Sequence, residues 1–201
     1  MKSTMIIAIA ILLILIIAQS FTIMSTKNTE NQQYTVVLKE KDFEVRFYPA
    51  TTIATINSSA KSYKELSGSG FRKLAGYIFG GNESDTKIAM TTPVHMDIND
   101  TMSSMSFVMP TKYSQENLPK PNDPNVIIKK TKDEYVAAIN FGGFASDNDM
   151  KVYSSKLASL LKERKIVTIG NFRYLGYNPP YQLIGRRNEI IVSVEWSAAK
   201  P

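Results

Sequence analysis

The chain has 201 residues, enough for one domain with extensions, and its 43% hydrophobic and 21% charged residues are an ordinary globular mixture. It contains no cysteine, which excludes thiolate metal sites, iron–sulfur clusters, cysteine nucleophiles and disulfide bonds. The formal net charge of +6 is spread along the chain with no block of like charges, so we expect no nucleic-acid partner.

An unbroken apolar run, Met5 to Ala18, follows Lys2 near the start of the chain. A basic residue ahead of a short apolar run is typical of a secretion signal, and Ala18 and Ser20 provide the small residues that a signal peptidase reads. Extension of the run through Met24 gives about 20 residues, which is enough to cross a bilayer. The run has no polar face, which disfavours a buried core helix. We expect either a cleaved signal peptide or a membrane anchor.

On this basis the chain divides into three parts. Residues 1–24 form the signal peptide or membrane anchor, and residues 25–33 (STKNTENQQ) are polar and aperiodic, which predicts a flexible spacer. Residues 34–197 form the folded domain. The N-terminal pattern predicts an exported domain, periplasmic or otherwise extracytoplasmic, that is either released or attached to the membrane by one N-terminal helix.

The domain alternates predicted strands with two predicted helices. Alternating apolar and β-branched residues indicate strands, and apolar residues at three-to-four spacing indicate helices. Two strands are expected within 34–49, then a strand at 51–59, a helix at 63–79, strands at 88–97 and 105–109, a proline-rich loop at 111–124, strands at 126–130 and 135–141, a helix at 147–164, and strands at 172–177 and 189–196.

The two halves of the domain repeat one order of elements. An offset of about 83 residues places Val45 on Ile128 and Ala54 on Ala137, and it superimposes the two predicted helices. Hairpin-connected strands dominate, so we expect an antiparallel sheet with helices on one side. The predicted fold class is α+β, with duplicated antiparallel β-sheet halves that form a distorted barrel with two main helices after an N-terminal apolar segment.

Five segments, in order, resemble the SOUL haem-binding protein family: FRKLAGYIFGGN from Phe71, KIAMTTPV from Lys87, FVMP from Phe107, LPKPNDP from Leu118 and YNPPYQLIGRRNEI from Tyr177. The resemblance covers residues 34–196, essentially the whole domain. It implies a duplicated α/β barrel with two helices and a tetrapyrrole held against an apolar face beside the first helix. The family also has relatives among bacterial ligand-sensing domains.

The first helix provides the candidate ligand-binding face. A flat, largely apolar macrocycle with two carboxylates requires apolar area for burial and cations for its acids. The candidate haem-binding residues are an apolar wall of Leu66, Phe71, Leu74, Ala75 and Ile78, with Arg72 and Lys73 at its margin. The alternative is that this stripe packs on the sheet, as the apolar side of any amphipathic helix must.

Two further arginines, Arg186 and Arg187, stand just before the last strand. The planar guanidinium fork is well shaped for a carboxylate, so both are candidate contacts for the acids of a ligand. Glu189 follows two residues later. A salt-bridged entrance to the last strand is therefore the alternative for this segment.

His95, the only histidine of the chain, lies between two methionines in KIAMTTPVHM. Histidine and methionine both serve as axial ligands of haem iron. Alternation along a strand places His95 on the same side as Pro93 and Asp97, which predicts a polar, solvated surface. We therefore expect this segment to be strand architecture, with no iron ligation by His95 and no metal site.

The sequence lacks the patterns that mark common catalytic sites. No GxSxG context surrounds a serine, and no glycine-rich phosphate loop is present, so we do not expect an enzyme. The predicted function is non-covalent binding or carriage of haem or a related tetrapyrrole, with the membrane as a second partner if the N-terminal segment is retained. The alternative is a cell-envelope interaction or small-molecule-sensing module of the same fold that binds no haem.

Overall fold

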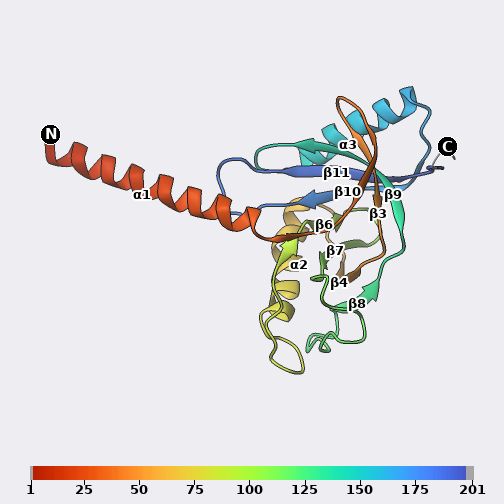
Figure 1. Ribbon diagram of the computed structural model, residues 1–201, viewed down its shortest axis with the longest axis horizontal. Helices are drawn as coiled ribbons and strands as arrows, with labels where there is room; N and C mark the ends of the chain where they lie inside the picture. Colours follow the sequence, from red (N-terminus) through yellow and green to blue (C-terminus); the bar gives the residue numbers. More distant parts are fainter. Residues whose placement is uncertain (1, 198–201) are drawn as a thin grey trace.

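A nine-stranded antiparallel sheet organises the computed structural model, which describes residues 2–197 (Figure 1). Its strands are β2 (Thr35–Lys39), β3 (Glu44–Tyr48), β4 (Thr52–Ser58), β6 (Val94–Asp97), β7 (Ser103–Val108), β8 (Ile127–Lys130), β9 (Glu134–Phe141), β10 (Thr168–Gly176) and β11 (Asn188–Val194). Their order across the sheet is β2-β3-β9-β11-β10-β6-β7-β4-β8. The α+β class predicted from the sequence is confirmed.

The strand order reflects the internal duplication. The 83-residue offset places β3, β4 and β7 on β8, β9 and β11. The pairing of β3 with β9 is therefore equivalent to that of β8 with β4, and the pairing of β4 with β7 is equivalent to that of β9 with β11. Of the three remaining strands, β6 and β10 pair with each other where the halves meet, and β2 pairs with β3 at one end of the sheet. Each half thus lends one strand to the other, which joins both halves around one core.

The predicted barrel does not close within the residues that the structure describes. β2 pairs only with β3, and β8 pairs only with β4, so the ladder ends at these two strands. Lys39 lies on β2, and Lys129 and Lys130 lie on β8. Lysines on edge strands disfavour the addition of a further strand, which is consistent with an open sheet.

Two helices, α2 (Tyr63–Ile78) and α3 (Asp147–Glu163), pack against the sheet. Ser62 and Ser146 cap them, and each hydroxyl accepts a hydrogen bond of 3.2 Å from the backbone N–H three residues later. α2 packs on β4 and β7, and α3 packs on the equivalent strands β9 and β11. Both helices begin where the sequence predicts and end one residue earlier.

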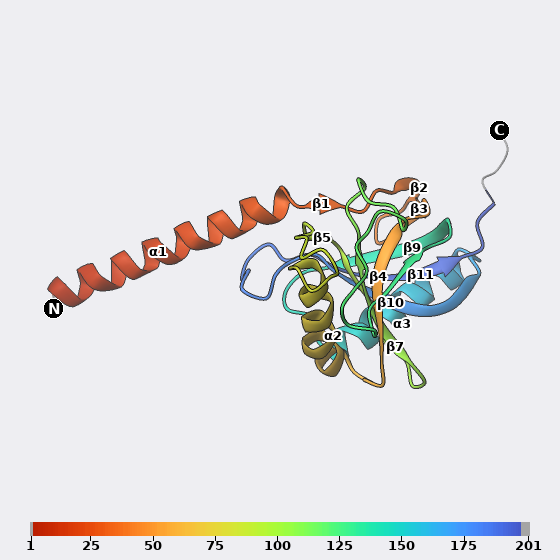
Figure 2. The same cartoon turned by 90° about the horizontal axis from the view of Figure 1, so that it is seen from below.

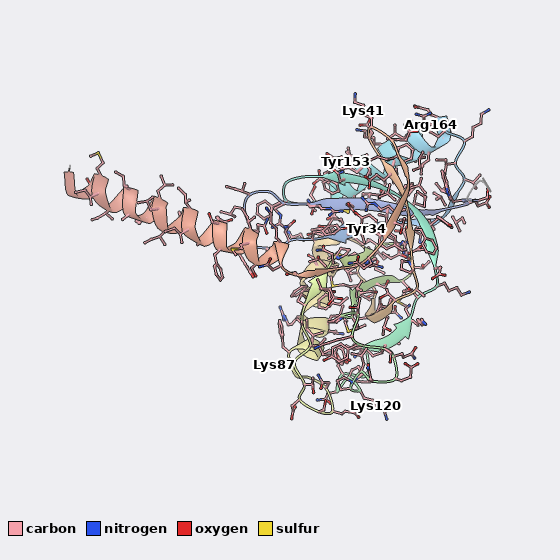
Figure 3. The ribbon with its side chains drawn as sticks, in the orientation of Figure 1. Tyr34, Lys41, Lys87, Lys120, Tyr153 and Arg164 are labelled. Atoms are coloured by element: carbon pink, nitrogen blue, oxygen red, sulfur yellow. The ribbon has the colours of Figure 1, made fainter. Side chains whose placement is uncertain are left out.

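The N-terminal apolar run forms one long helix, α1 (Lys2–Lys27), that projects from the body of the molecule (Figures 1 and 2). Most of its side chains extend away from the domain on all sides (Figure 3). The part from Thr4 to Lys27 is long and apolar enough to cross a membrane, a test that a signal sequence near an N-terminus also passes.

The segment after α1 is attached to the domain and differs in this from the flexible spacer that the sequence predicts. β1 (Glu30–Asn31) pairs in parallel with β5 (Thr91–Thr92), and the backbone N–H of Gln32 donates to the carbonyl of Thr92 at 2.8 Å. Backbone pairing of this kind depends little on side-chain pattern, so an aperiodic polar sequence does not reveal it. The predicted domain boundary at Tyr34 stays a prediction.

Candidate functional site

The inner face of α2 belongs to the hydrophobic core. Leu66 and Leu74 are fully buried against the sheet, and Ile78 is nearly so. Gly70 lies on the same face, where an added Cβ would lie 3.3 Å from the side chain of Met105 on β7. Of the predicted apolar wall, the structure buries Leu66, Leu74, Ala75 and Ile78. A ligand beside α2 would therefore contact other side chains.

A second face of α2, which we call the outer strip, points away from the core. It consists of Gly68, Phe71 and Arg72, together with Phe79, the C-cap residue of the helix, and these residues follow one another at helical spacing. Phe71 is 38% exposed and Phe79 is 64% exposed, although Phe71 also contacts the sheet through Phe107, with ring centroids 5.2 Å apart. A Cβ at Gly68 would have nothing within 4 Å, so the surface there is flat and open.

Sequence reasoning found part of the outer strip. Two of its residues, Phe71 and Arg72, were predicted as site residues, and so was Lys73 at its margin. All three are exposed. Gly68 and Phe79 were missed, because three-to-four periodicity identifies the side of a helix that faces the core. The same spacing, counted outward from Phe71, would have found both.

Glu189 lies fully buried on β11 and binds two arginines. Arg46 donates to both carboxylate oxygens at 2.7 and 3.0 Å, and Arg187 donates to Oε1 at 2.6 Å. Tyr177 donates its hydroxyl to Oε2 at 2.8 Å. Burial alone would raise the pKa of Glu189, but the hydrogen bonds and charges of the two arginines outweigh burial and hold the pKa below its ordinary value. Arg187 therefore already has a carboxylate partner inside the protein.

Arg186 is bound to the loop that carries it. Its Nη1 donates to the carbonyls of Pro179 and Gln182 at 2.7 and 2.8 Å, and its guanidinium lies 4.4 Å from the ring centroid of Phe144. A ligand carboxylate would compete with these contacts. The predicted role of Arg186 and Arg187 toward a ligand stays a prediction.

A polar cleft of about 380 Å³ lies beside the Glu189 cluster, and Tyr34, labelled in Figure 3, forms part of its wall. Its lining residues are Tyr34, Glu44, Arg46, Asn140, Phe141, Gly142, Arg186, Arg187 and Glu189. Acidic and basic side chains are mixed in it, and none of the lining residues comes from α2. Such a lining suits a small polar ligand better than a large apolar macrocycle.

His95 lies on β6 and faces away from α2. Its neighbour Met96 is paired with Met105, which lies under α2, so His95 points to the opposite face of the sheet. Its Nε2 hydrogen-bonds with the side-chain oxygen of Gln32 at 2.7 Å. Burial, reinforced by the charge of Arg173, lowers the pKa of His95 to about 4. The segment before the domain covers part of this face, so His95 is half-buried and less solvated than the sequence predicts.

The described part of the chain holds no group of three or more histidine, aspartate or glutamate side chains placed to bind a metal ion. The features that could receive a ligand are thus the outer strip of α2 and the polar cleft. A duplicated α+β sheet with an exposed helical face of this kind defines a ligand-binding class of protein more readily than a catalytic one.

Comparison with known proteins assigns the family. Residues 29–193 match the family model described as SOUL heme-binding protein, so the chain belongs to this family. It is 31% identical to Heme-binding protein 1 of Xenopus laevis over 172 residues, which cover 80% of this chain and 90% of that protein. It is also 31% identical to Heme-binding protein 2 of Mus musculus over 157 residues, or 74% of this chain and 76% of that protein. The predicted resemblance is confirmed.

Solved structures of distant sequence share the fold. The C-terminal domain of EcmrR aligns with a TM-score of 0.54 at 10% identity, over 81% of this chain and 98% of that one. An uncharacterized conserved protein from Listeria innocua aligns with a TM-score of 0.55 at 10% identity, over 78% and 93%. At this level of identity the similarity concerns the fold alone.

Proposed function

We propose that the domain binds haem or a related tetrapyrrole non-covalently, without transforming it. The observation that carries this proposal is the family match over residues 29–193, together with relatives named for haem binding that align along most of their length. The chain offers one histidine, hydrogen-bonded to Gln32, and no cysteine, which favours binding over catalysis.

We place the ligand on the outer strip of α2. A macrocycle laid there would cover Phe71 and Phe79, and the open surface at Gly68 would let a flat ring approach the helix backbone. Arg72 and Lys73 would meet its carboxylates from the margin. Leu66 and Leu74 would take no direct part, because they are already buried against the sheet.

We further propose that α1 is retained and anchors an extracytoplasmic domain, residues 34–197, to the membrane. Lys2 ahead of the apolar run supports this orientation, because basic residues concentrate on the cytoplasmic side of membrane spans. Hydrogen bonds between α1 and the domain support retention. A cleaved signal peptide, residues 1–24, is the alternative, and the mass of the chain isolated from its host distinguishes the two.

A second candidate function rests on the polar cleft beside Glu189. A cell-envelope sensing module of the same fold would bind a small polar molecule there and no haem. Its mixed arginine and glutamate lining fits a ligand that carries both donors and acceptors. In that case haemin would not bind to the outer strip.

Titration of the full chain, held in a nanodisc, with haemin tests the first candidate through the Soret absorbance. Phe71→Glu should weaken binding at least about tenfold, or about 1.4 kcal/mol, because it places a negative charge under the ring. Ser154→Glu is the matched control, since Ser154 occupies the position on α3 that is 83 residues after Phe71. Thermal melting should establish that both variants fold. Equal affinity in wild type and Phe71→Glu would exclude the outer strip as the site.

A further inference from the structure

The loop between β10 and β11, residues 177–187, exposes three large side chains next to one another. Tyr181 is 67% exposed, Leu183 57% and Ile184 66%. A group of large apolar side chains on a loop of a folded domain marks a surface that meets a partner. We call these three residues the loop tip.

The loop tip is hydrogen-bonded to α1. The side-chain amide of Gln19 donates to the carbonyl of Tyr181 at 3.1 Å and accepts from the backbone N–H of Leu183 at 2.8 Å. About two turns further along α1, Thr26 donates to the side-chain oxygen of Gln182 at 2.9 Å. The loop is therefore fixed beside the part of α1 that emerges from the apolar run.

The position of Gln19 along α1 sets the depth of the loop tip. About 20 residues cross the bilayer core, so a span that starts at Thr4 reaches Ile23. Gln19 then lies four residues inside that boundary, or about 6 Å at about 1.5 Å per residue. This matches the depth of about 5–10 Å to which interfacial apolar groups insert. Figures 1 and 2 agree that this loop is the part of the body that reaches furthest along α1 toward its N-terminus.

Most backbone carbonyls of the loop accept hydrogen bonds from the protein itself. Backbone carbonyls near a bilayer core need hydrogen-bond donors from the protein itself. Arg186 donates to carbonyls of the loop, and Gln182, which is buried, donates to two more. Together with the donation from Gln19, the carbonyls that find a donor are those of Asn178, Pro179, Tyr181, Gln182, Ile184 and Gly185.

Gln19 supplies an independent reason to place lipid here. A side-chain amide in an apolar segment is costly in a bilayer unless its donor and acceptor both have partners. The loop backbone provides one partner of each kind. The same two hydrogen bonds therefore pair the amide of Gln19 on α1 and two backbone groups of the loop. This pairing is a reason for Gln19 and the loop to lie at the same depth in the bilayer.

We propose that the loop tip is a second membrane contact of this protein, inserted into the outer boundary of the bilayer beside α1. Leu183 and Ile184 enter the acyl-chain boundary, and Tyr181 lies at the level of the headgroups, where tyrosine is enriched. The partner is the lipid surface itself. This inference rests on the proposed retention of α1. Two contacts fix the orientation of the domain on the membrane, which one helix with a free linker would not do.

Site-specific labelling tests the proposal without interference, because the chain has no cysteine of its own. Leu183→Cys would be labelled with an environment-sensitive fluorophore in the full chain, reconstituted in phosphatidylcholine vesicles. Ile127→Cys is the control, since Ile127 is also an exposed apolar residue, 47% accessible, but lies on the edge strand β8. The expected result is blue-shifted emission at position 183 that brominated lipid quenches, with neither effect at position 127.

A third sample carries Leu183→Cys together with Gln19→Leu, which keeps the helix apolar and removes both hydrogen bonds to the loop. Quenching at position 183 should fall in this sample. Absence of quenching at position 183 in the first sample would overturn the proposal, and so would equal quenching at positions 183 and 127, which would indicate adsorption of the whole domain. Loss of quenching on addition of haemin would also overturn it, because the loop tip would then contact the tetrapyrrole. The comparison of positions 183 and 127 without haemin depends neither on whether the host cleaves α1 nor on whether the domain binds haemin in the titration above.

Discussion

α2 and α3 occupy equivalent places in the two halves of the domain, and their inner faces match at two fully or almost fully buried positions. Leu74 and Leu157 are 83 residues apart and are both fully buried against the sheet. Ile78 and Leu161 correspond in the same way. The outer strip of α2, Gly68, Phe71, Arg72 and Phe79, has as its counterpart on α3 the residues Lys151, Ser154, Ser155 and Lys162.

This difference separates folding from function. The matched inner positions are apolar in both helices, because both helices cover the same kind of strand pair. The outer face of α3 carries lysines and serines, the composition of a surface that meets only water. The outer face of α2 has two exposed phenylalanines at the equivalent positions, Phe71 and Phe79. Phe71 also packs on Phe107, but the apolar area that both residues leave exposed favours an apolar ligand.

The largest effect should come from the shared inner faces. Leu74→Glu and Leu157→Glu should each lower the free energy of unfolding by about 4 kcal/mol, since each buries an unpaired charge at a fully enclosed position. Urea denaturation of the two variants checks this. A large loss in one helix and none in the other would show that the halves are not equivalent at their cores.

Glu189 on β11 and Ser106 on β7 are also 83 residues apart, and they extend the comparison of the two halves from the helices to the sheet. Glu189→Gln should cost about 3 kcal/mol of stability, because it removes the two-pronged carboxylate contact of the buried Arg46 and leaves that charge only the half-buried Glu44. Ser106→Ala should cost about 1 kcal/mol, because only a neutral hydrogen bond to Thr55 is lost. Chemical denaturation measures both, and equal costs would contradict the asymmetry between the halves.

The pH dependence of stability tests the junction between the halves, where His95 lies on β6. Its pKa is lowered from 6.5 to about 4 in the fold, so between these values the unfolded chain binds the proton and the folded chain does not. The free energy of unfolding should therefore decrease as the pH is lowered, by about 2 kcal/mol between pH 7.5 and pH 5. His95→Gln should remove this loss when urea midpoints are compared.

The neighbours of His95 bear on the same curve. Burial raises the pKa of Glu134, but the hydrogen bond and charge of Arg173 outweigh burial and hold this pKa below its ordinary value. A carboxylate with a lowered pKa stabilises the fold above its unfolded pKa and loses that contribution as pH falls further. Glu134 and Glu189 therefore add to the loss below about pH 4.5. A curve that is flat between pH 7.5 and 5 would contradict the half-buried, neutral imidazole.

The smallest effect should be that of His95 on haemin binding. His95 lies on the face of the sheet opposite to α2 and is hydrogen-bonded to Gln32. His95→Ala should therefore lower haemin affinity less than about tenfold, or under about 1.4 kcal/mol, with little change in the Soret band. A collapse of affinity and spectrum together would identify the imidazole as the iron ligand.

Much of the fold was predictable because it depends on periodicity. The two amphipathic helices, the antiparallel strands and the 83-residue repeat all leave a regular apolar pattern in the sequence. The open ends of the sheet, and the pairing of Glu30–Asn31 with Thr91–Thr92, depend on backbone hydrogen bonds between distant segments and leave no such pattern.

The site was less predictable for a related reason. The apolar stripe of α2 is the signal for its core side, so four of the predicted wall residues are inside the protein. The surface around His95 is less solvated than predicted because Gln32, 63 residues earlier in the chain, covers part of it. Arg187 was predicted with two alternatives, and the structure shows it paired with Glu189, although a ligand contact there is untested.

The most direct test of the account is where haemin lies on the protein. Ferric haemin broadens nearby amide signals, so NMR spectra of the full chain in nanodiscs, with haemin and with diamagnetic gallium protoporphyrin, would locate it. We predict selective broadening at Gly68 and Arg72, with the signals of the equivalent residues Lys151 and Ser155 unchanged. Equal broadening at both helices, or broadening confined to the polar cleft around Glu189, would contradict the assignment of the outer strip of α2 as the binding surface.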